Sequence, residues 1–396
     1  MRDPGRKALI LAGAVLLGLG GLMAAVRVRG HSDPNELATG VRLALNNRQW
    51  SRAEDLLARL ARQRPPTVDD VVLRAELEQG RNHVDEAVGL LCGIPESDPS
   101  AASARLVAGQ IEKKRDRARH MEALFLEALR LDPKLILPRR ELIFLYAMQA
   151  RRADLNAQYR TLAEREPLDY DDVFFWMNSF ENLWINNLIR PHLERYVAAD
   201  PEDRVSRLAL AGVLVRYNEL EGAEALLQPF PDSDPDARVL RARIALGRMR
   251  LDEVRSILDR GPAEHIGLAL LRGHLAVRSK DPATAARQYR IALRLDPDNR
   301  EALEGLSAVL KQLGDSEGAA AAQKRADQWR HLTRLLQRSH VFNIRNDKAL
   351  LIELGEACEA LGQLPEARAW YRLALAQDPL DPAVQKCLHR VRGGDR

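Results

Sequence analysis

Cysteine, histidine and acidic residues are the side chains of this chain that could carry catalysis or bind a metal. The three cysteines, Cys92, Cys358 and Cys387, form no CxxC pair, and no two of the nine histidines lie three or four residues apart. Metal sites and nucleophile–base pairs usually show such spacing or a recognisable motif. Adjacent carboxylates such as Asp171 and Asp172 fall at expected helix starts, where they accept hydrogen bonds from free backbone N–H groups. We therefore predict no catalytic residue, no metal and no cofactor, and cysteines that serve as small buried side chains.

Aromatic side chains gather in one short stretch of the chain. Six of them fall within residues 170–184. Rings anchor partner peptides, and amides bond a peptide backbone. Phe174, Asn178 and Asn182 recur at helical spacing, so they are candidates for partner binding. The alternative is that the rings pack an irregular junction between helices.

Prolines recur at a fixed interval and indicate the elements that must position these residues. Proline has no N–H group and restricts the residue before it, so it ends helices. A period of about 34 residues is typical of a two-helix unit stacked into an array. Six prolines follow this period: Pro65, Pro99, Pro133, Pro167, Pro201 and Pro235.

These units resemble tetratricopeptide repeats. The motif expects a small residue in the first helix, then alanine, an aromatic residue and a closing proline. In the clearest unit these positions are held by Gly355, Ala367, Tyr371 and Pro379, with Ala374 between the last two. The resemblance implies an all-α, right-handed superhelical solenoid of helix–turn–helix repeats that binds a protein or peptide in a concave groove. Independently of the family, a small residue in one helix lets a ring from the next helix approach closely.

Polar residues of the first helices are expected to line the groove. Counting back from each proline places Lys113, Arg140 and Arg216 on this face, together with the residues of the aromatic stretch. The predicted partner-binding residues are Phe174, Asn178, Asn182, Arg140, Lys113 and Arg216.

Departures from the repeat suggest where the array is irregular. The unit between Pro235 and Pro262 is short, which predicts a clipped second helix at 253–260, and no proline closes the unit that follows Pro297. We expect residues 331–346 to extend or join helices. The predicted domains are an anchor at 1–30, a repeat array at 31–235, irregular repeats at 236–345 with one regular repeat at 263–297, and a C-terminal repeat with its cap at 346–396.

The N-terminus carries an apolar run with basic flanks. Residues 8–26 contain no charged side chain, and at about 1.5 Å per residue the run is long enough to cross a bilayer as a helix. We predict a single transmembrane helix here; a cleaved signal peptide is the alternative. The three basic residues before the run outnumber the two after it, Arg27 and Arg29, which favours repeats on the extracytoplasmic side.

Charge and composition exclude several classes of function. The net charge is +4, and basic residues are interspersed with acidic ones, as on solvated helix faces. A nucleic-acid surface would gather them on one side, so we predict no nucleic-acid partner and no small-molecule substrate. The sequence favours a non-enzymatic, membrane-anchored scaffold or adaptor in the envelope, chaperone-like in character. The alternatives are a cytoplasmic-facing subunit that tethers an enzyme to the membrane, and an enzyme without a recognisable motif.

Overall fold

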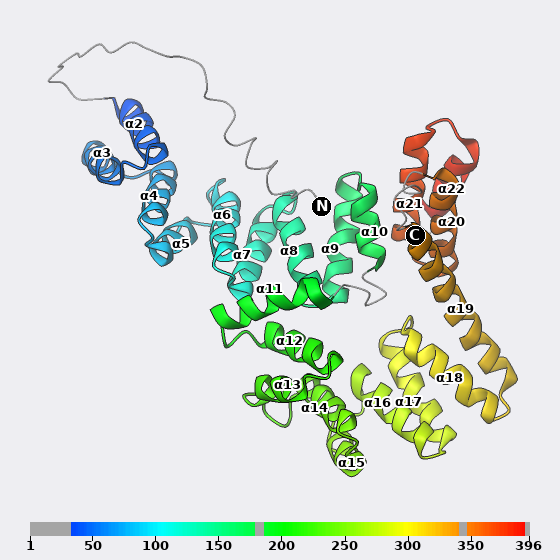
Figure 1. Cartoon of the computed structure of the whole chain (residues 1–396). Coiled ribbons are helices and arrows are strands. Elements are labelled where there is room, and N and C mark those ends of the chain that lie inside the picture. Colours follow the sequence, from blue (N-terminus) through cyan, green and yellow to red (C-terminus); the bar gives the residue numbers. More distant parts are fainter. Residues whose placement is uncertain (1–32, 179–185, 340–346, 393–396) are drawn as a thin grey trace. The chain divides into compact units, whose positions relative to one another are not determined.

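The computed structural model describes residues 33–178, 186–339 and 347–392, which form helices joined by turns and short loops (Figure 1). They form 21 helices, and no strand occurs among them, as the all-α prediction required. The chain divides into two compact units, one up to Gly80 and one from Arg81 onward. The domain boundaries expected from the sequence remain predictions.

From residue 33 onward, the first unit holds three helices around a small core. They are α2 (Pro34–Asn46), α3 (Trp50–Gln63) and α4 (Val68–Gly80). α2 begins at Asp33, whose carboxylate accepts a hydrogen bond from the N–H of Asn35, and Pro34 occupies the first helical position. Such a cap satisfies backbone donors that the first turn leaves open. The buried core residues of this unit are Val41, Ala44, Leu45, Ala53, Leu57, Leu73 and Leu77.

The second unit holds the remaining helices, most of which pack as consecutive antiparallel pairs. Their bounds are α5 (Val84–Cys92), α6 (Ala101–Lys114), α7 (Ala118–Leu131), α8 (Leu137–Met148), α9 (Arg152–Arg165), α10 (Tyr170–Asn178), α11 (Asn186–Ala199), α12 (Arg204–Arg216), α13 (Leu220–Leu227), α14 (Pro235–Gly247), α15 (Leu251–Asp259), α16 (Ile266–Arg278), α17 (Pro282–Leu295), α18 (Arg300–Gln312), α19 (Ser316–Ser339), α20 (Lys348–Ala360), α21 (Leu364–Gln377) and α22 (Pro382–Arg392).

The turns inside the pairs share one backbone conformation. Apart from α10, whose end borders residues that the structure does not describe, each first helix ends two residues before a residue with positive φ, where the chain reverses. Arg48, the first of them, lies half a repeat period before Pro65. Where a closing proline is present, the turn and the proline thus mark the two ends of the second helix. Among the described residues, those with positive φ are Arg48, Asn82, Asp116, Ala150, Asn218, Met249, Lys280, Gly314 and Gly362, and the last two are glycines.

Close helix pairs follow the predicted contact between glycine and a ring. A Cβ atom on Gly355 would lie 2.3 Å from Cε1 of Tyr371, which is fully buried. The same relation holds between Gly273 and Tyr289, where the distance would be 2.6 Å. Only glycine leaves room for the ring at these positions.

Irregular helices occur where the prolines depart from their period. α15 has nine residues, in agreement with the predicted clipped helix, whereas α17 has 14. α13 is also short, with eight residues, because Pro229 follows its end at Leu227. No proline stands half a period after Gly314, and α19 accordingly continues to Ser339 over 24 residues. This extension agrees with the expectation for residues 331–339.

The C-terminal repeat packs against helices far away in the sequence. α21 contacts both α9 and α10, and α10 also contacts α19. Arg160 of α9 donates two hydrogen bonds, of 2.9 and 3.1 Å, to the carboxylate of Glu366, and Arg372 donates one of 2.6 Å to the carbonyl oxygen of Ala163. We call these contacts of α9 and α10 with α19–α21 the closure. They bring together residues that lie 206 and 209 positions apart, which an open array of repeats would not do.

Aromatic and sulfur groups complete the closure. The hydroxyl of Tyr170 donates to the carbonyl oxygen of Ser339 at 2.6 Å, and its ring meets Trp370 edge-on with centroids 5.9 Å apart. Cys358 Sγ lies 3.8 Å from Met177 Sδ. One core therefore continues from the first repeats of this unit to its last.

The predicted transmembrane segment, residues 8–26, lies outside the described residues. Among the helices that the structure does describe, none combines the length and the apolar character needed to span a bilayer.

Candidate functional site

Lys113, one of the predicted partner-binding residues, lies at the C-terminal end of α6 and faces α8. Its Nζ atom is 2.5 Å from Oε2 of Glu141 and 5.5 Å from the centre of the Phe144 ring. His192 of α11 meets the same ring edge-on, with centroids 5.3 Å apart. Lys113 thus joins α6 to α8, and its half-exposed ammonium already has a carboxylate partner.

Arg140 lies on α8 and binds two carboxylates at once. Its guanidinium donates to Glu166 at 2.6 and 3.1 Å and to both oxygens of Asp172 at 3.0 Å. Burial lowers the pKa of Arg140, but the bonds to Asp172 and Glu166 outweigh it and leave the pKa above its ordinary value. Burial also raises the pKa of Asp172, and the Arg140 bond offsets only part of that. This fork fixes the start of α10 against α8.

α10 carries the predicted aromatic residues. Phe174 is half-buried and stacks on Tyr170, with centroids 5.7 Å apart and ring planes 13° apart. Trp176 is fully buried and stacks on Tyr159 at 5.4 Å. The Asn178 side chain donates to the carbonyl oxygen of Phe174 at 3.0 Å. These contacts hold α10 in place, and the role of Phe174 and Asn178 in partner binding stays a prediction.

The remaining predicted residues lie elsewhere. Arg216 is at the last position of α12, on its exposed side. Asn182 lies outside the described residues. Of the six, the structure brings Arg140 close to the start of α10 through Asp172, two residues before Phe174. Lys113 ties α6 to α8 through Glu141, and Arg140 ties α8 to the start of α10 through Asp172.

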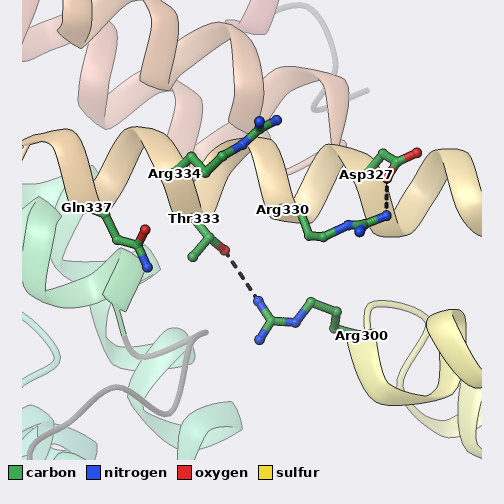
Figure 2. A pocket seen from close by; sticks show the side chains of 6 residues that line it. All are labelled: Arg300, Asp327, Arg330, Thr333, Arg334 and Gln337. Carbon is green, nitrogen blue, oxygen red and sulfur yellow. Dashed lines mark hydrogen bonds and ion pairs between the residues drawn. The ribbon is translucent and has the colours of Figure 1, made fainter.

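A basic pocket that sequence reasoning missed lies between α18 and α19 (Figure 2). Its volume is about 440 Å³. One arginine comes from the first position of α18, and the other residues come from successive turns of the extended α19. The lining residues are Arg300, Asp327, Arg330, Thr333, Arg334 and Gln337.

Contacts inside the basic pocket connect Arg300 to α19 and pair two residues of α19 with each other. Arg300 reaches from α18 and donates to Oγ1 of Thr333 at 3.4 Å, while Arg330 forms an ion pair with Asp327 (Figure 2). Arg334 extends from α19 on the side away from Arg300 in this view. Three arginines and one aspartate thus line one cavity.

The sequence held a partial signal for this pocket. Asp327, Arg330, Arg334 and Gln337 recur at steps of three and four residues, the spacing of one helix face. That spacing is visible only if α19 runs past residue 331. Arg300 is brought to the same cavity by tertiary packing, which no local pattern reports.

The cysteines form no disulfide within the described part of the chain. Cys358 and Cys387 are buried, as predicted, while Cys92 is half-buried. Burial raises the pKa of Cys358 well above its ordinary value, which keeps this thiol protonated and unreactive.

Comparison with known proteins supports the repeat assignment. Sequence models of the tetratricopeptide repeat match residues 190–244, 270–333 and 348–391. A curated relative, cellulose synthase operon protein C from Xanthomonas axonopodis pv. citri, is 28% identical over 257 residues, which cover 58% of this chain and 16% of that protein. The chain thus spans about a sixth of the length of the curated relative that it matches.

Solved structures that resemble the chain share low sequence identity with it. The APC/C hetero-tetramer Cut9-Hcn1 is similar with a TM-score of 0.36 and 14% identity, over 91% of this chain and 90% of that chain. A tetratricopeptide repeat protein from Parabacteroides merdae has a TM-score of 0.32 and 13% identity, over 70% of this chain and 98% of that chain. The paired helices, the contacts between glycine and aromatic rings, and the three sequence matches lead to one conclusion: this chain contains tetratricopeptide repeats.

Proposed function

We propose that this chain is a non-enzymatic scaffold that binds protein or peptide partners through its repeats and assembles them into a larger complex. The observation that carries the proposal is the match to tetratricopeptide repeats, units that typically bind proteins or peptides. The first helices of such arrays present a concave surface, and a right-handed superhelix is part of this proposal.

Anchoring in the cell membrane is the second part of the proposal. It rests on the apolar residues 8–26 and on their basic flanks. The name of the Xanthomonas relative refers to a cellulose synthase operon, which is consistent with an association with the cell envelope. In this proposal the repeats lie on the extracytoplasmic side, where they have a chaperone-like role in envelope assembly. A cytoplasmic-facing subunit that tethers an enzyme is the second candidate, because the flanks differ by one positive charge.

Partner binding is assigned to the groove residues and to α10. Phe174 is half-buried, and Asn178 stands one turn further along the same helix. The competing role for this stretch is helix packing, which the stacking on Tyr170 favours. A double variant distinguishes the two roles.

The test is crosslinking and affinity capture with the full chain expressed in its native membrane. We expect a partner that wild type retains to be lost from the Phe174→Ala/Asn178→Ala variant, while both proteins give the same far-ultraviolet circular dichroism. Leu380→Ala is the control, because this side chain is 84% exposed and lies outside the predicted site. A partner retained equally by all three proteins would place binding away from α10, and no partner in any of them would contradict the scaffold.

Reporter fusions to the C-terminus test the side of the membrane. An alkaline phosphatase fusion should be active and a cytoplasmic fluorescent fusion dark if the repeats are extracytoplasmic. The reverse result would favour the cytoplasmic tethering subunit.

A further inference from the structure

The basic pocket between α18 and α19 differs from the other charged sites of the second unit. Arg140 and Arg160 each bind carboxylates of neighbouring helices. Arg334 has no hydrogen bond or ion pair with any of the residues that the structure describes, and neither has Gln337. Both side chains are exposed on the wall of the pocket. A donor group is therefore left open at a cavity.

The back wall of the pocket is held rigidly. Thr333 is buried, and its hydroxyl donates to the carbonyl oxygen of Trp329 at 3.0 Å while accepting from Arg300. Trp329 is itself buried, and its indole N–H donates to Asp298 at 3.3 Å. Arg300 follows Asn299, whose side chain caps α18. The position of Arg300 relative to α19 is thus set by contacts outside the pocket.

The charges around the pocket favour an anion. Arg330 and Arg334 are one turn apart on α19, and like charges at this spacing repel. Asp327 compensates only Arg330. Guanidinium groups bind carboxylates through paired, charge-assisted hydrogen bonds. An anion in the pocket would relieve the repulsion and give Arg334 a partner.

The size and lining of the pocket favour peptide side chains over a lone ion or a nucleic acid. About 440 Å³ is in the range of sites that take ligands of several functional groups. The amide of Gln337 and the hydroxyl of Thr333 can bond a peptide backbone. No aromatic ring is among the six lining residues, so the pocket has no surface on which a base would stack.

We propose that Arg300, Arg330 and Arg334 bind the side-chain carboxylates of an acidic segment in a partner protein. The inference rests on the proposed scaffold function and names the chemistry of its partner. The site lies at the start of α18 and along the extended α19, and none of its six lining residues is among the partner-binding residues predicted from the sequence.

Binding of a labelled hexaglutamate peptide with an amidated C-terminus tests the inference. The full chain, in detergent, is titrated and fluorescence anisotropy is recorded. We expect the Arg330→Gln/Arg334→Gln variant to bind about tenfold more weakly, because two charge-assisted contacts are lost. The matched control is Arg290→Gln/Arg338→Gln, which removes the same charge from exposed arginines that pair with Asp315 and Glu353. It should bind within about twofold of wild type.

Three results would overturn the inference. One is equal loss of binding in both double variants, which would indicate attraction to net charge alone. Another is equal binding of hexaglutamine, which has no carboxylate. The third is tighter binding of a single-stranded oligonucleotide or of inorganic phosphate, with the same dependence on Arg330 and Arg334.

The outcomes also separate this inference from the scaffold proposal. If hexaglutamate does not bind while the full chain still captures a partner, the acidic-segment site is wrong and the scaffold stands. If hexaglutamate binds through Arg330 and Arg334 but no protein is captured by crosslinking, the anion site stands and the scaffold is wrong.

Discussion

At the scale of single residues, the contact between Gly355 and Tyr371 determines how closely α20 and α21 pack. We expect Gly355→Ala to lower the free energy of local unfolding by about 1–3 kcal/mol, because the added methyl group meets a fully buried ring. Hydrogen exchange of the amides in α20 and α21 measures this quantity.

Gly89 in α5 provides the matched control. A Cβ atom there would meet nothing within 4 Å. Gly89→Ala should therefore stabilise α5 by about 0.5–1 kcal/mol, the usual gain of alanine over glycine inside a helix. If the two substitutions had the same effect, the explanation by steric contact would be wrong.

The sequence predicted these residue contacts because they are local. Gly355 and Tyr371 occupy neighbouring helices of one repeat, and the repeat motif determines the spacing between them in the sequence. The partners of Lys113 and Arg140 were not predicted, since both were expected to face a ligand. In the structure Glu141 binds Lys113, and Asp172 binds Arg140. An arginine or lysine on the solvent-facing side of one helix can also reach the next helix of the array.

At the scale of helices, the ion pair between Arg160 and Glu366 ties α9 to α21. Burial raises the pKa of Glu366 above its ordinary value of 4.5, and Arg160 offsets part of this shift. A carboxyl group with a raised pKa binds its proton more tightly in the folded than in the unfolded chain. Stability from this group is therefore full at a pH below 4.5 and falls as the pH rises through the raised pKa.

We expect Glu366→Gln to flatten this pH dependence. Glutamine keeps the acceptor oxygen for Arg160 and carries no proton to lose. Urea unfolding at several pH values above 4.5 should show wild type losing stability relative to the variant as the pH rises. Asp236→Asn serves as the opposite case. The hydrogen bond from His265 lowers the pKa of Asp236 to about 2, so the stability that the Asp236 carboxylate contributes is lost as the pH falls. Parallel curves for wild type and Glu366→Gln would contradict the assignment.

Helix lengths could be predicted only where proline determines them. The end of α17 follows from Pro297, and the length of α15 from the early Pro262. The basic pocket was beyond prediction because Arg300 and Arg334 belong to different helices whose crossing depends on packing. The sequence indicated that α19 has no closing proline but did not indicate what its extra turns contact.

At the scale of the whole second unit, the closure joins repeats that an open array would keep apart. Arg160, Ala163 and Tyr170 all bond to residues beyond position 338. No sequence pattern reports such contacts, because the period of the repeat describes only neighbours. The order of the repeats along the chain was thus predictable, but the contact of the C-terminal repeat with α9 and α10 was not.

Removal of residues 347–396 tests the closure. We expect the amides of α9 and α10 to exchange at least about tenfold faster, because each lost charge-assisted hydrogen bond contributes roughly 1.5–3 kcal/mol. The amides of α14 (Pro235–Gly247), which contributes none of the closure contacts described above, should be unchanged and serve as the internal control. Unchanged exchange in α9 would mean that the closure adds no stability to it.

The closure also sets an order of events during protein synthesis. Ribosomes add about 5–20 residues per second, so the face of α9 and α10 leaves the ribosome roughly 10–40 s before Glu366 and Trp370 are made. During this interval Tyr170 and Met177 lack the partners that cover them in the finished protein. The nascent chain therefore exposes an apolar face in the middle of an otherwise folded array, where holding chaperones would bind and where slowed translation would most increase misfolding.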